Sequence, residues 1–539
     1  MKKQRISILF LLICLCFVMG ACGKQTIAET PEEKTKDMFE KETEEETDAE
    51  TAVETDEQDE AVVEYPMIKT QIVREVSEWD EELGVILING SYDEICLMDD
   101  NYPKLKKTIE KINADNKEEI ITECSGFTED AKEFFIYMEP EYATAWEANN
   151  TAYVKRADEN VCSVLFAKYR YFGGAHPSSW YESHNIDVKT GAELTLRDVV
   201  KDYDGLYNEV LAKLEAEENR FKELYGESLV YYENYREIVE DYFYSDNGEF
   251  PLAFTVCGDG IEVYFDAYTI GPYSSGDTIL FFPFEEYPDM FSNKVTDYTE
   301  TFSKEIMQFQ SVEMDVDGDG EAEKIRLDAY YYEEDFYVDY VIRCNDYSLD
   351  VTMFGEFASA RLMKNTNGKV YLYLENSEMN DYHYISVYSF ENDVPTYVGE
   401  PGAAFRGYFV EDTQSFYMNK KVDFLGTYTG YRKYRMGEDG MPVPIEQDYQ
   451  LEQTWINGLV STKELKVTVY ADENATEGKE DILPVGTTFY PYATDEATYV
   501  KCRLDNGKVC VIHAEKEDYQ IYIDGVSEYD CFEMVPYAG

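Results

Sequence analysis

Two periodicities of hydrophobic and polar positions run through this chain. After Pro103, which suits the first turn of a helix, Leu105, Ile109 and Ile112 recur at the spacing of one helical face. Residues 161–169 instead follow the two-residue period of a β-strand. The first half of the chain therefore predicts both helices and strands.

The mixed pattern continues to about residue 290. Thr195 and Asp198 resemble a capping box that predicts the start of a helix, and residues 203–244 predict a long charged helical region. Turn residues then separate three short strand-like runs, which are 250–256, 261–265 and 279–284. Mixed elements with hairpin connections predict an α+β fold with an antiparallel sheet and helices.

Beyond residue 311 the strand pattern dominates. Strands are expected over 336–343, 369–375 and 384–390. The chain's 48 tyrosines suit half-buried strand positions, although their rings could also stack on sugars. This part predicts a β-rich domain within a multidomain protein.

The last 80 or so residues carry a pattern of their own. Leu465-Lys466-Val467, Leu483-Pro484-Val485-Gly486-Thr487 and Tyr499-Val500 resemble a small bacterial SH3-like barrel. Val509-Cys510 stands where such a barrel usually has Gly-Trp after its last turn. The departure falls at the position that would form a peptide-binding groove.

The N-terminus indicates where the protein works. Lys2, Lys3 and Arg5 precede an apolar run that ends just before Cys22, the arrangement of a bacterial lipoprotein signal. An ordinary secretory signal and an uncleaved anchor are the alternatives, although the run is short for a bilayer span of about 20 residues. We expect acylated Cys22 to hold the protein on the extracytoplasmic face of the cell membrane.

Charge narrows the choice of partners. The chain has 47 basic and 111 acidic residues, a net charge of −64. Such a surface repels phosphate backbones, which excludes nucleic acid, and attracts cationic proteins and divalent cations. Solubility is the alternative reason for the acidity. Residues 22–64, rich in Glu, Asp, Thr and Ala, predict a disordered acidic tether.

These patterns predict six segments. They are a signal peptide over 1–21, the tether over 22–64, a small α+β domain over 65–157, a second α+β domain over 158–292, a β-rich domain over 311–455 and an SH3-like β domain over 460–539.

Cysteines offer one further structural prediction. Apart from Cys14, Cys16 and Cys22, eight remain, and no C-x-x-C spacing occurs. Cys502 and Cys510 flank Asp505-Asn506-Gly507, a hairpin turn that would place the two sulfurs opposite each other. They form either a disulfide or two buried thiols.

An ordered series of motifs carries a family resemblance. The motifs are Tyr171-Phe172-Gly173-Gly174-Ala175-His176-Pro177, Asn185-Ile186-Asp187 with Gly191, Asp259-Gly260-Ile261-Glu262-Val263-Tyr264-Phe265, and Pro272-Tyr273-Ser274-Ser275-Gly276. They resemble the RsiV-type extracytoplasmic domain of lysozyme-sensing anti-sigma factors, which also accompanies the deacetylase domain of PdaC-type proteins. Residues 67–157 are similar to the shorter domain that precedes it. The resemblance implies recognition of lysozyme, another cationic protein or peptidoglycan.

His176 is the centre of the candidate binding site, with Tyr171, His184 and Asp187 as its neighbours. A histidine after two glycines could accept a proton. The same run is also typical of a tight loop in which the glycines supply unusual backbone angles and the imidazole bonds to a local carbonyl. We favour the structural interpretation and assign no catalytic residue.

The sharpest motif beyond residue 311 is an acidic loop. Its carboxylates are those of Asp315, Asp317, Asp319, Glu321 and Glu323. Their spacing is typical of a calcium loop, but position twelve is an arginine and strand-forming residues follow, unlike an EF-hand. We predict a structural calcium site, with an unmetallated turn as the alternative.

The sequence as a whole predicts a non-enzymatic binding or sensing protein of the bacterial envelope. One rival is a hydrolase or deacetylase that modifies peptidoglycan or another glycan, because acidic pairs such as Glu285-Glu286 are frequent. The other rival is an assembly scaffold without a soluble ligand.

Overall fold

The computed structural model describes most of the chain beyond the tether. The described residues are 65–98, 100–138, 144–226, 230–244, 252–298, 300–332, 336–378, 382–407, 409–452, 458–517 and 519–537. All of them belong to one compact unit, 63–539. Among the described helices, none combines the length and hydrophobicity that a bilayer span requires.

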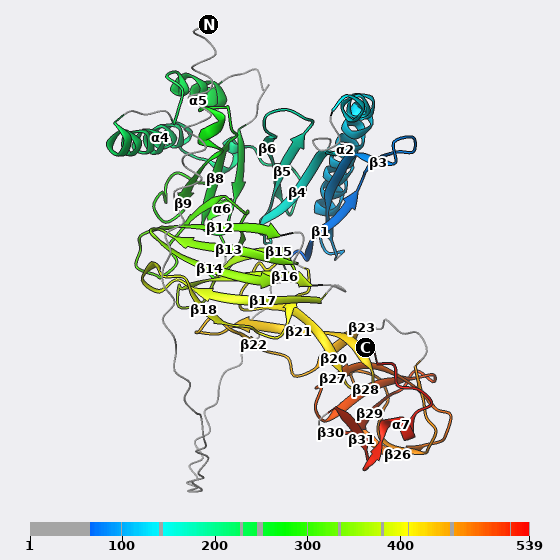
Figure 1. Ribbon diagram of the computed structural model, residues 1–539. Coiled ribbons are helices and arrows are strands. Elements are labelled where there is room, and N and C mark those ends of the chain that lie inside the picture. Colours follow the sequence, from blue (N-terminus) through cyan, green and yellow to red (C-terminus); the bar gives the residue numbers. More distant parts are fainter. Residues whose placement is uncertain are drawn as a thin grey trace, which may run out of the picture. The chain divides into compact units, whose positions relative to one another are not determined.

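A six-stranded sheet opens the fold (Figure 1). Its strands are β1 (Ile68–Glu75), β2 (Glu78–Asp80), β3 (Val85–Leu97), β4 (Trp146–Ala157), β5 (Val161–Tyr171) and β6 (Ser178–Asp187). The main path runs β1-β3-β4-β5-β6, and β2 pairs with β3. β3 and β4 are parallel because a long helix connects them, whereas the other pairs are antiparallel.

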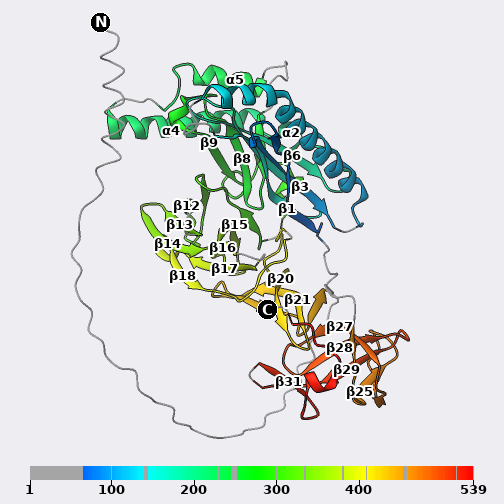
Figure 2. The same ribbon diagram turned by 45° about the vertical axis from the view of Figure 1, so that its right-hand side comes forward.

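That connection is α2 (Pro103–Tyr137), and it packs against β3 and β4 (Figure 2). The helix begins at Pro103, as predicted, since proline lacks only an amide hydrogen that the first turn does not use. Leu105, Ile109 and Ile112 are buried in the core with strand residues such as Val164. The helical spacing in the sequence is thus confirmed as a core-facing stripe.

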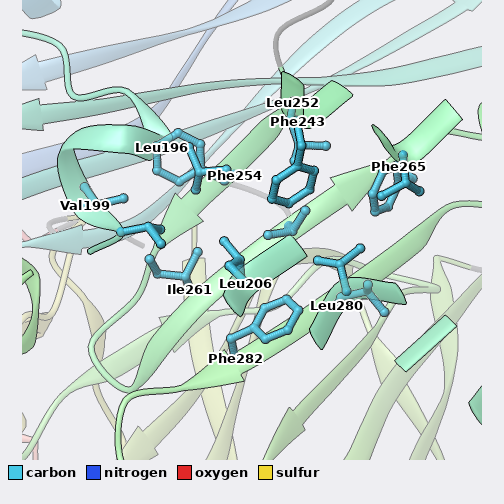
Figure 3. Packing of buried hydrophobic residues seen from close by; sticks show 14 of the residues in the cluster. Leu196, Val199, Leu206, Phe243, Leu252, Phe254, Ile261, Phe265, Leu280 and Phe282 are labelled. Atoms are coloured by element: carbon cyan, nitrogen blue, oxygen red, sulfur yellow. The ribbon is translucent and has the colours of Figure 1, made fainter. Parts of the chain in front are cut away.

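A second sheet with helices follows. Its antiparallel strands are β7 (Ala253–Val256), β8 (Gly260–Phe265) and β9 (Thr278–Pro283), and its helices are α3 (Leu196–Val199), α4 (Tyr203–Tyr225), α5 (Tyr235–Tyr244) and α6 (Asn293–Thr296). Leu206, Phe243, Phe254, Ile261 and Phe282 meet in its core (Figure 3).

The charged helical region predicted over 203–244 is present as two helices, α4 and α5. Gly226 ends α4 with a left-handed backbone, φ +82°, and its amide bonds to the carbonyl of Lys222. Glycine adopts this conformation without the steric cost that a Cβ brings. The capping box is confirmed, because the amide of Thr195 donates to Asp198 at 2.8 Å.

Two antiparallel sheets form the β-rich region, as predicted. One comprises β11 (Ser311–Met314), β12 (Glu323–Tyr332), β13 (Tyr337–Cys344) and β14 (Tyr347–Phe354). The other comprises β10 (Ser303–Glu305), β15 (Glu356–Lys364), β16 (Val370–Glu378), β17 (Tyr382–Ser389) and β18 (Thr396–Gly399). They share a core that includes Tyr340, Leu362 and Leu372.

The C-terminal part forms an eleven-stranded sheet and a small three-stranded one. The large sheet comprises β19 (Ala404–Phe405), β20 (Phe416–Asp423), β21 (Thr427–Met436), β22 (Pro442–Pro444), β23 (Tyr449–Glu452), β24 (Leu459–Val460), β25 (Leu465–Tyr470), β26 (Lys479–Leu483), β27 (Thr488–Thr494), β28 (Tyr499–Leu504) and β29 (Val509–His513). The small sheet comprises β30 (Glu515–Glu517), β31 (Gln520–Ile523) and β32 (Val526–Ser527), followed by α7 (Glu528–Cys531).

The separate SH3-like barrel expected over 460–539 differs from what is observed. β27 pairs with β23 and β24 as well as with β28, so the sheet continues into the preceding region. The path ends at β26, whose partner among the described strands is β25. Pairing of the described strands therefore leaves this sheet open.

Buried charges join β4, β8 and β10. Lys155 Nζ lies 3.4 Å from Glu262 Oε2, and Lys304 Nζ lies 2.9 Å from Asp259 Oδ1 and 3.7 Å from Glu262 Oε1. Both lysine side chains are almost fully buried. The α+β sheets thus contact the β-rich region through ion pairs as well as apolar packing.

Candidate functional site

The His176 loop connects β5 to β6. Gly173 and Gly174 both have positive φ values, +76° and +124°, which residues with a Cβ rarely adopt. A Cβ on Gly173 would also lie 3.3 Å from Nε1 of Trp146. The sequence correctly predicted that these glycines shape a tight loop.

Both imidazole nitrogens of His176 have partners. Nδ1 lies 2.8 Å from the carbonyl oxygen of Pro177, and Nε2 lies 2.9 Å from the hydroxyl of Tyr268. A carbonyl can only accept, so Nδ1 donates to Pro177, and Nε2 forms the hydrogen bond with the hydroxyl of Tyr268. The prediction of a local carbonyl partner is confirmed.

Two tyrosines complete an aromatic patch with His176. The ring of Tyr273 stacks on the imidazole, with centroids 3.9 Å apart and planes at 18°. Tyr268 lies 5.7 Å from the imidazole and 5.5 Å from Tyr273. We call His176, Tyr268 and Tyr273 the aromatic patch.

Backbone strain marks Tyr268. Its φ is +70°, an uncommon value for a residue with a large side chain, and 54% of the residue is exposed. Residues held in such conformations cluster at functional sites, where the surrounding structure enforces them. The strain holds an aromatic ring toward solvent.

Carboxylates hold the turn that carries Tyr268. Asp277 accepts from the hydroxyl of Tyr181 at 2.9 Å and from the amide of Ala267 at 2.8 Å. Asp266 accepts from the amide of Tyr181 at 3.0 Å. Burial, with Asp277 nearby, raises the pKa of Asp266 to about 7. The patch therefore sits beside acidic groups.

The other predicted neighbours of His176 do not join it. Tyr171 remains in the loop, where its hydroxyl donates to the carbonyl of Gly174 at 3.4 Å. His184 is opposite Val164 in the hairpin, roughly 20 Å along the strand from Ser178 at its rise per residue. Its nitrogens face Glu182 at 3.2 Å and Glu193 at 3.4 Å.

Asp187 lies at the opposite end of the hairpin from the His176 loop. It accepts from the amide of Thr190 at 2.8 Å and pairs with Lys294. Burial works against ionisation, but Lys294 and Thr190 outweigh it and hold the pKa of Asp187 below its ordinary value. Its role here is to close a turn and anchor α6.

The acidic loop connects β11 to β12, and a strand follows it as predicted. Ligand atoms of Asp315, Asp317 and Glu323 lie within 4.8 Å of one another, the one such group found among the described residues. Burial and the neighbouring acids raise the pKa of Glu323. Asp319 and Glu321 stay outside this group, and the amide of Glu321 donates to Asp319.

Cys502 and Cys510 are directly opposite in the β28–β29 hairpin, in the predicted register. Both are buried and present as free thiols. Burial, together with Cys510, raises the pKa of the Cys502 thiol. Of the six other described cysteines, Cys96 is half-buried and the rest are buried, while Cys22 lies outside the described residues.

Sequence reasoning missed Tyr268 and Tyr273 as partners of His176. They lie more than 90 residues along the chain, and no local periodicity connects them to the loop. Tyr273 falls within one of the motifs that carried the family resemblance. That motif was the signal that could have pointed to this surface.

Two comparisons with known proteins found similarities. Residues 91–179 match the family model described as deacetylase PdaC. A solved structure of a DUF3298 family member from Bacteroides fragilis is 17% identical and covers 43% of this chain and 95% of that chain, with a TM-score of 0.31. A solved structure of a DUF3298 family protein from Pseudomonas aeruginosa is 14% identical and covers 41% of this chain and 95% of that chain, with a TM-score of 0.26.

The search of curated proteins found no match. The matched residues run from the middle of β3 to the start of β6 and include α2 and the whole His176 loop. The PdaC resemblance recognised in the sequence is confirmed over this segment. Residues 91–179 are thus the part of this chain that is similar to the deacetylase PdaC family.

Proposed function

We propose that this protein is a non-enzymatic binding module of the bacterial envelope, and that its aromatic patch binds a cationic protein such as lysozyme. The observation that carries the proposal is the patch itself. Its rings are held in place by stacking and by the hydrogen bond from Tyr268 to His176, and Tyr268 and His176 are exposed.

Binding fits this surface better than catalysis. A general base needs a nitrogen within hydrogen-bond reach of the substrate's proton. Both nitrogens of His176 are instead engaged by Tyr268 and Pro177, and His184 faces two glutamates. Because residues 91–179 match a deacetylase family, the experiments below also test the enzymatic alternative.

A cationic ligand fits the chemistry around the patch. Aromatic faces attract lysine and arginine, and Tyr and Trp dominate the energetic centres of protein interfaces. Asp266 and Asp277 lie beside the patch, and the net charge of −64 steers cationic proteins toward the surface. Binding should therefore weaken as salt is added.

Calorimetric titration of lysozyme into the whole purified chain tests this proposal. Tyr273→Ala and Tyr268→Ala should each weaken binding by about tenfold or more, as expected for central interface residues. Tyr519→Ala is the matched control, because Tyr519 is 97% exposed and lies elsewhere in the chain. Equal affinities of all three variants would reject the patch as the binding surface.

The enzymatic rival is tested on the same preparations. Peptidoglycan fragments incubated with the chain, with and without divalent metal, should keep their mass. A mass change that is lost in His176→Ala would overturn the proposal in favour of a hydrolase or deacetylase. If the chain shows no lysozyme binding and no turnover, the assembly scaffold is the remaining function.

We also propose lipid anchoring at Cys22. The signal-like N-terminus and the acidic tether over 22–64 support it. Mass spectrometry of the mature N-terminal peptide should find acyl chains on Cys22, and Cys22→Ala should move the protein from the membrane to the soluble fraction. An unmodified N-terminus with its leader retained would reject the anchor.

Calcium is the proposed occupant of the acidic loop. Asp315, Asp317 and Glu323 offer clustered oxygen ligands, and oxygen is the ligand that Ca²⁺ prefers. The ion would stabilise the β11–β12 hairpin. Asp317→Ala should abolish calcium binding in calorimetry, whereas Asp346→Ala, an exposed acid in a neighbouring turn, should retain it.

A further inference from the structure

A cavity of about 510 Å³ lies beside the β11–β12 hairpin. Helix α4 contributes Lys213 and Arg220, and strand β12 contributes Lys324 and Arg326. Strands β9 and β11 supply further walls. Four basic side chains from two distant parts of the sequence thus converge on one space.

This convergence is unusual for such an acidic chain. Acidic residues outnumber basic ones 111 to 47 overall, yet the cavity is lined by four basic residues and by three acidic ones, Glu217, Asp277 and Glu313. Two of these acids have partners: Glu217 accepts from the hydroxyl of Tyr231 and lies 3.9 Å from Arg220, and Asp277 accepts from Tyr181 and Ala267.

The lysines, in contrast, are available. Among the described residues, no carboxylate lies within ion-pair distance of Nζ of Lys213 or Lys324. Arg326 is held in place by Asp328 at 2.5 Å, and Asp328 is shared with Arg343 at 3.2 Å. The cavity therefore presents two ammonium groups that have no ion pair among the described residues, with Glu313 opposite Lys324 on β11. Its two guanidinium groups are paired, Arg326 with Asp328 and Arg220 with Glu217.

We propose that this cavity binds a sugar that carries a single phosphate or carboxylate. Lysine and arginine are the side chains that bind these oxyanions, and arginine adds a planar set of donors. Thr278, Gln310 and Ser311 line the same space and can bond to sugar hydroxyls. A long polyanion is disfavoured, because the acidic surface around the cavity repels it.

The inference stands apart from the proposed function. None of the three rings of the aromatic patch lines the cavity, although Asp277 lies beside both, and a cationic protein would not occupy a site lined by lysines. Lysozyme affinity should therefore be the same for the cavity variants and the unmodified chain. Failure of one proposal leaves the other intact.

Calorimetry on the whole chain tests the cavity with four probes: glucose 1-phosphate, glucuronate, inorganic phosphate and glucose. One of the anionic sugars should bind, glucose should not, and inorganic phosphate should bind more weakly than the sugar phosphate. The tighter of the two anionic sugars identifies phosphate or carboxylate as the recognised group. If inorganic phosphate binds as tightly as both anionic sugars, the sugar is rejected as part of the ligand.

Variants locate the binding. Lys213→Gln and Lys324→Gln should each weaken it tenfold or more, whereas Lys107→Gln, an exposed lysine on α2, should leave it unchanged. Unchanged thermal unfolding midpoints would show that the variants are folded. Equal binding by all variants, or no binding of either anionic sugar at millimolar concentration, would overturn the proposal.

Discussion

Glu262 and Asp266 lie four residues apart around the end of β8, and their carboxyl groups behave in opposite ways. Burial raises the pKa of a carboxyl group, but the charges of Lys155 and Lys304 outweigh burial and lower the pKa of Glu262 to about 2. Burial and the charge of the neighbouring Asp277 instead raise the pKa of Asp266 to about 7.

The difference teaches that pairing decides what a buried charge does. Around Glu262 every charge has a partner, which makes the cluster a joint between sheets. Asp266 and the two cavity lysines have no ion pair among the described residues, and we propose binding beside them. Breaking each arrangement should therefore give a different result.

The largest expected effect is on the buried cluster. Lys304→Met leaves Asp259 and Glu262 with an uncompensated buried charge and should lower the free energy of unfolding by about 3–5 kcal/mol. Urea denaturation measures it. Adding Glu262→Gln to this variant should recover part of the loss, and a loss under about 1 kcal/mol would contradict the pairing argument.

Asp266 should make stability depend on pH. Its folded pKa lies above the unfolded value, so the folded state binds the proton more tightly and stability falls as pH rises from about 4 to about 7. At pH 8 the free energy of unfolding of Asp266→Asn should therefore exceed that of the unmodified chain by about 2–4 kcal/mol. At pH 4 the two free energies should be equal. Denaturation at the two pH values compares them. A constant difference would show that another group titrates.

A smaller effect is expected at Tyr264. Its hydroxyl donates to Glu262 at 2.5 Å and lies 3.0 Å from the hydroxyl of Thr255. Tyr264→Phe removes a hydrogen bond to a buried charge and should cost about 1.5–3 kcal/mol in urea denaturation. Tyr347→Phe, at an exposed strand position, is the control and should change little.

The smallest effect is expected at the cavity. Lys324→Gln removes an exposed charge that has no carboxylate partner among the described residues, so stability should stay within about 0.5 kcal/mol. The same denaturation experiment measures it. A loss comparable to that of Lys304→Met would mean that the cavity lysine is structural and would erase the contrast between the two regions.

Much of the fold followed from local pattern. The helix after Pro103, the capping box at Thr195, the glycine angles of the His176 loop and the opposed Cys502 and Cys510 all depend on residues close in sequence. The charged helical region over 203–244 was also predicted, but not its division at Gly226, whose left-handed conformation ends α4. The separate C-terminal barrel failed because strand pairing is not a local property.

Only part of the candidate site could be predicted from the sequence. His176 and the acidic loop were found from motifs, but His184 and Asp187 were grouped with His176 by sequence distance alone. Because β6 is an extended strand of ten residues, His184 and Asp187 lie far from the loop although they are close to it in sequence.

The sequence by itself determined the acidity, the similarity to PdaC over residues 91–179 and the local elements, because composition, motifs and turn chemistry are properties of neighbouring residues. Only the tertiary structure decided which charges are paired, which rings stack on His176 and which lysines face a common cavity. Those contacts join segments tens to more than a hundred residues apart, and burial sets their electrostatics.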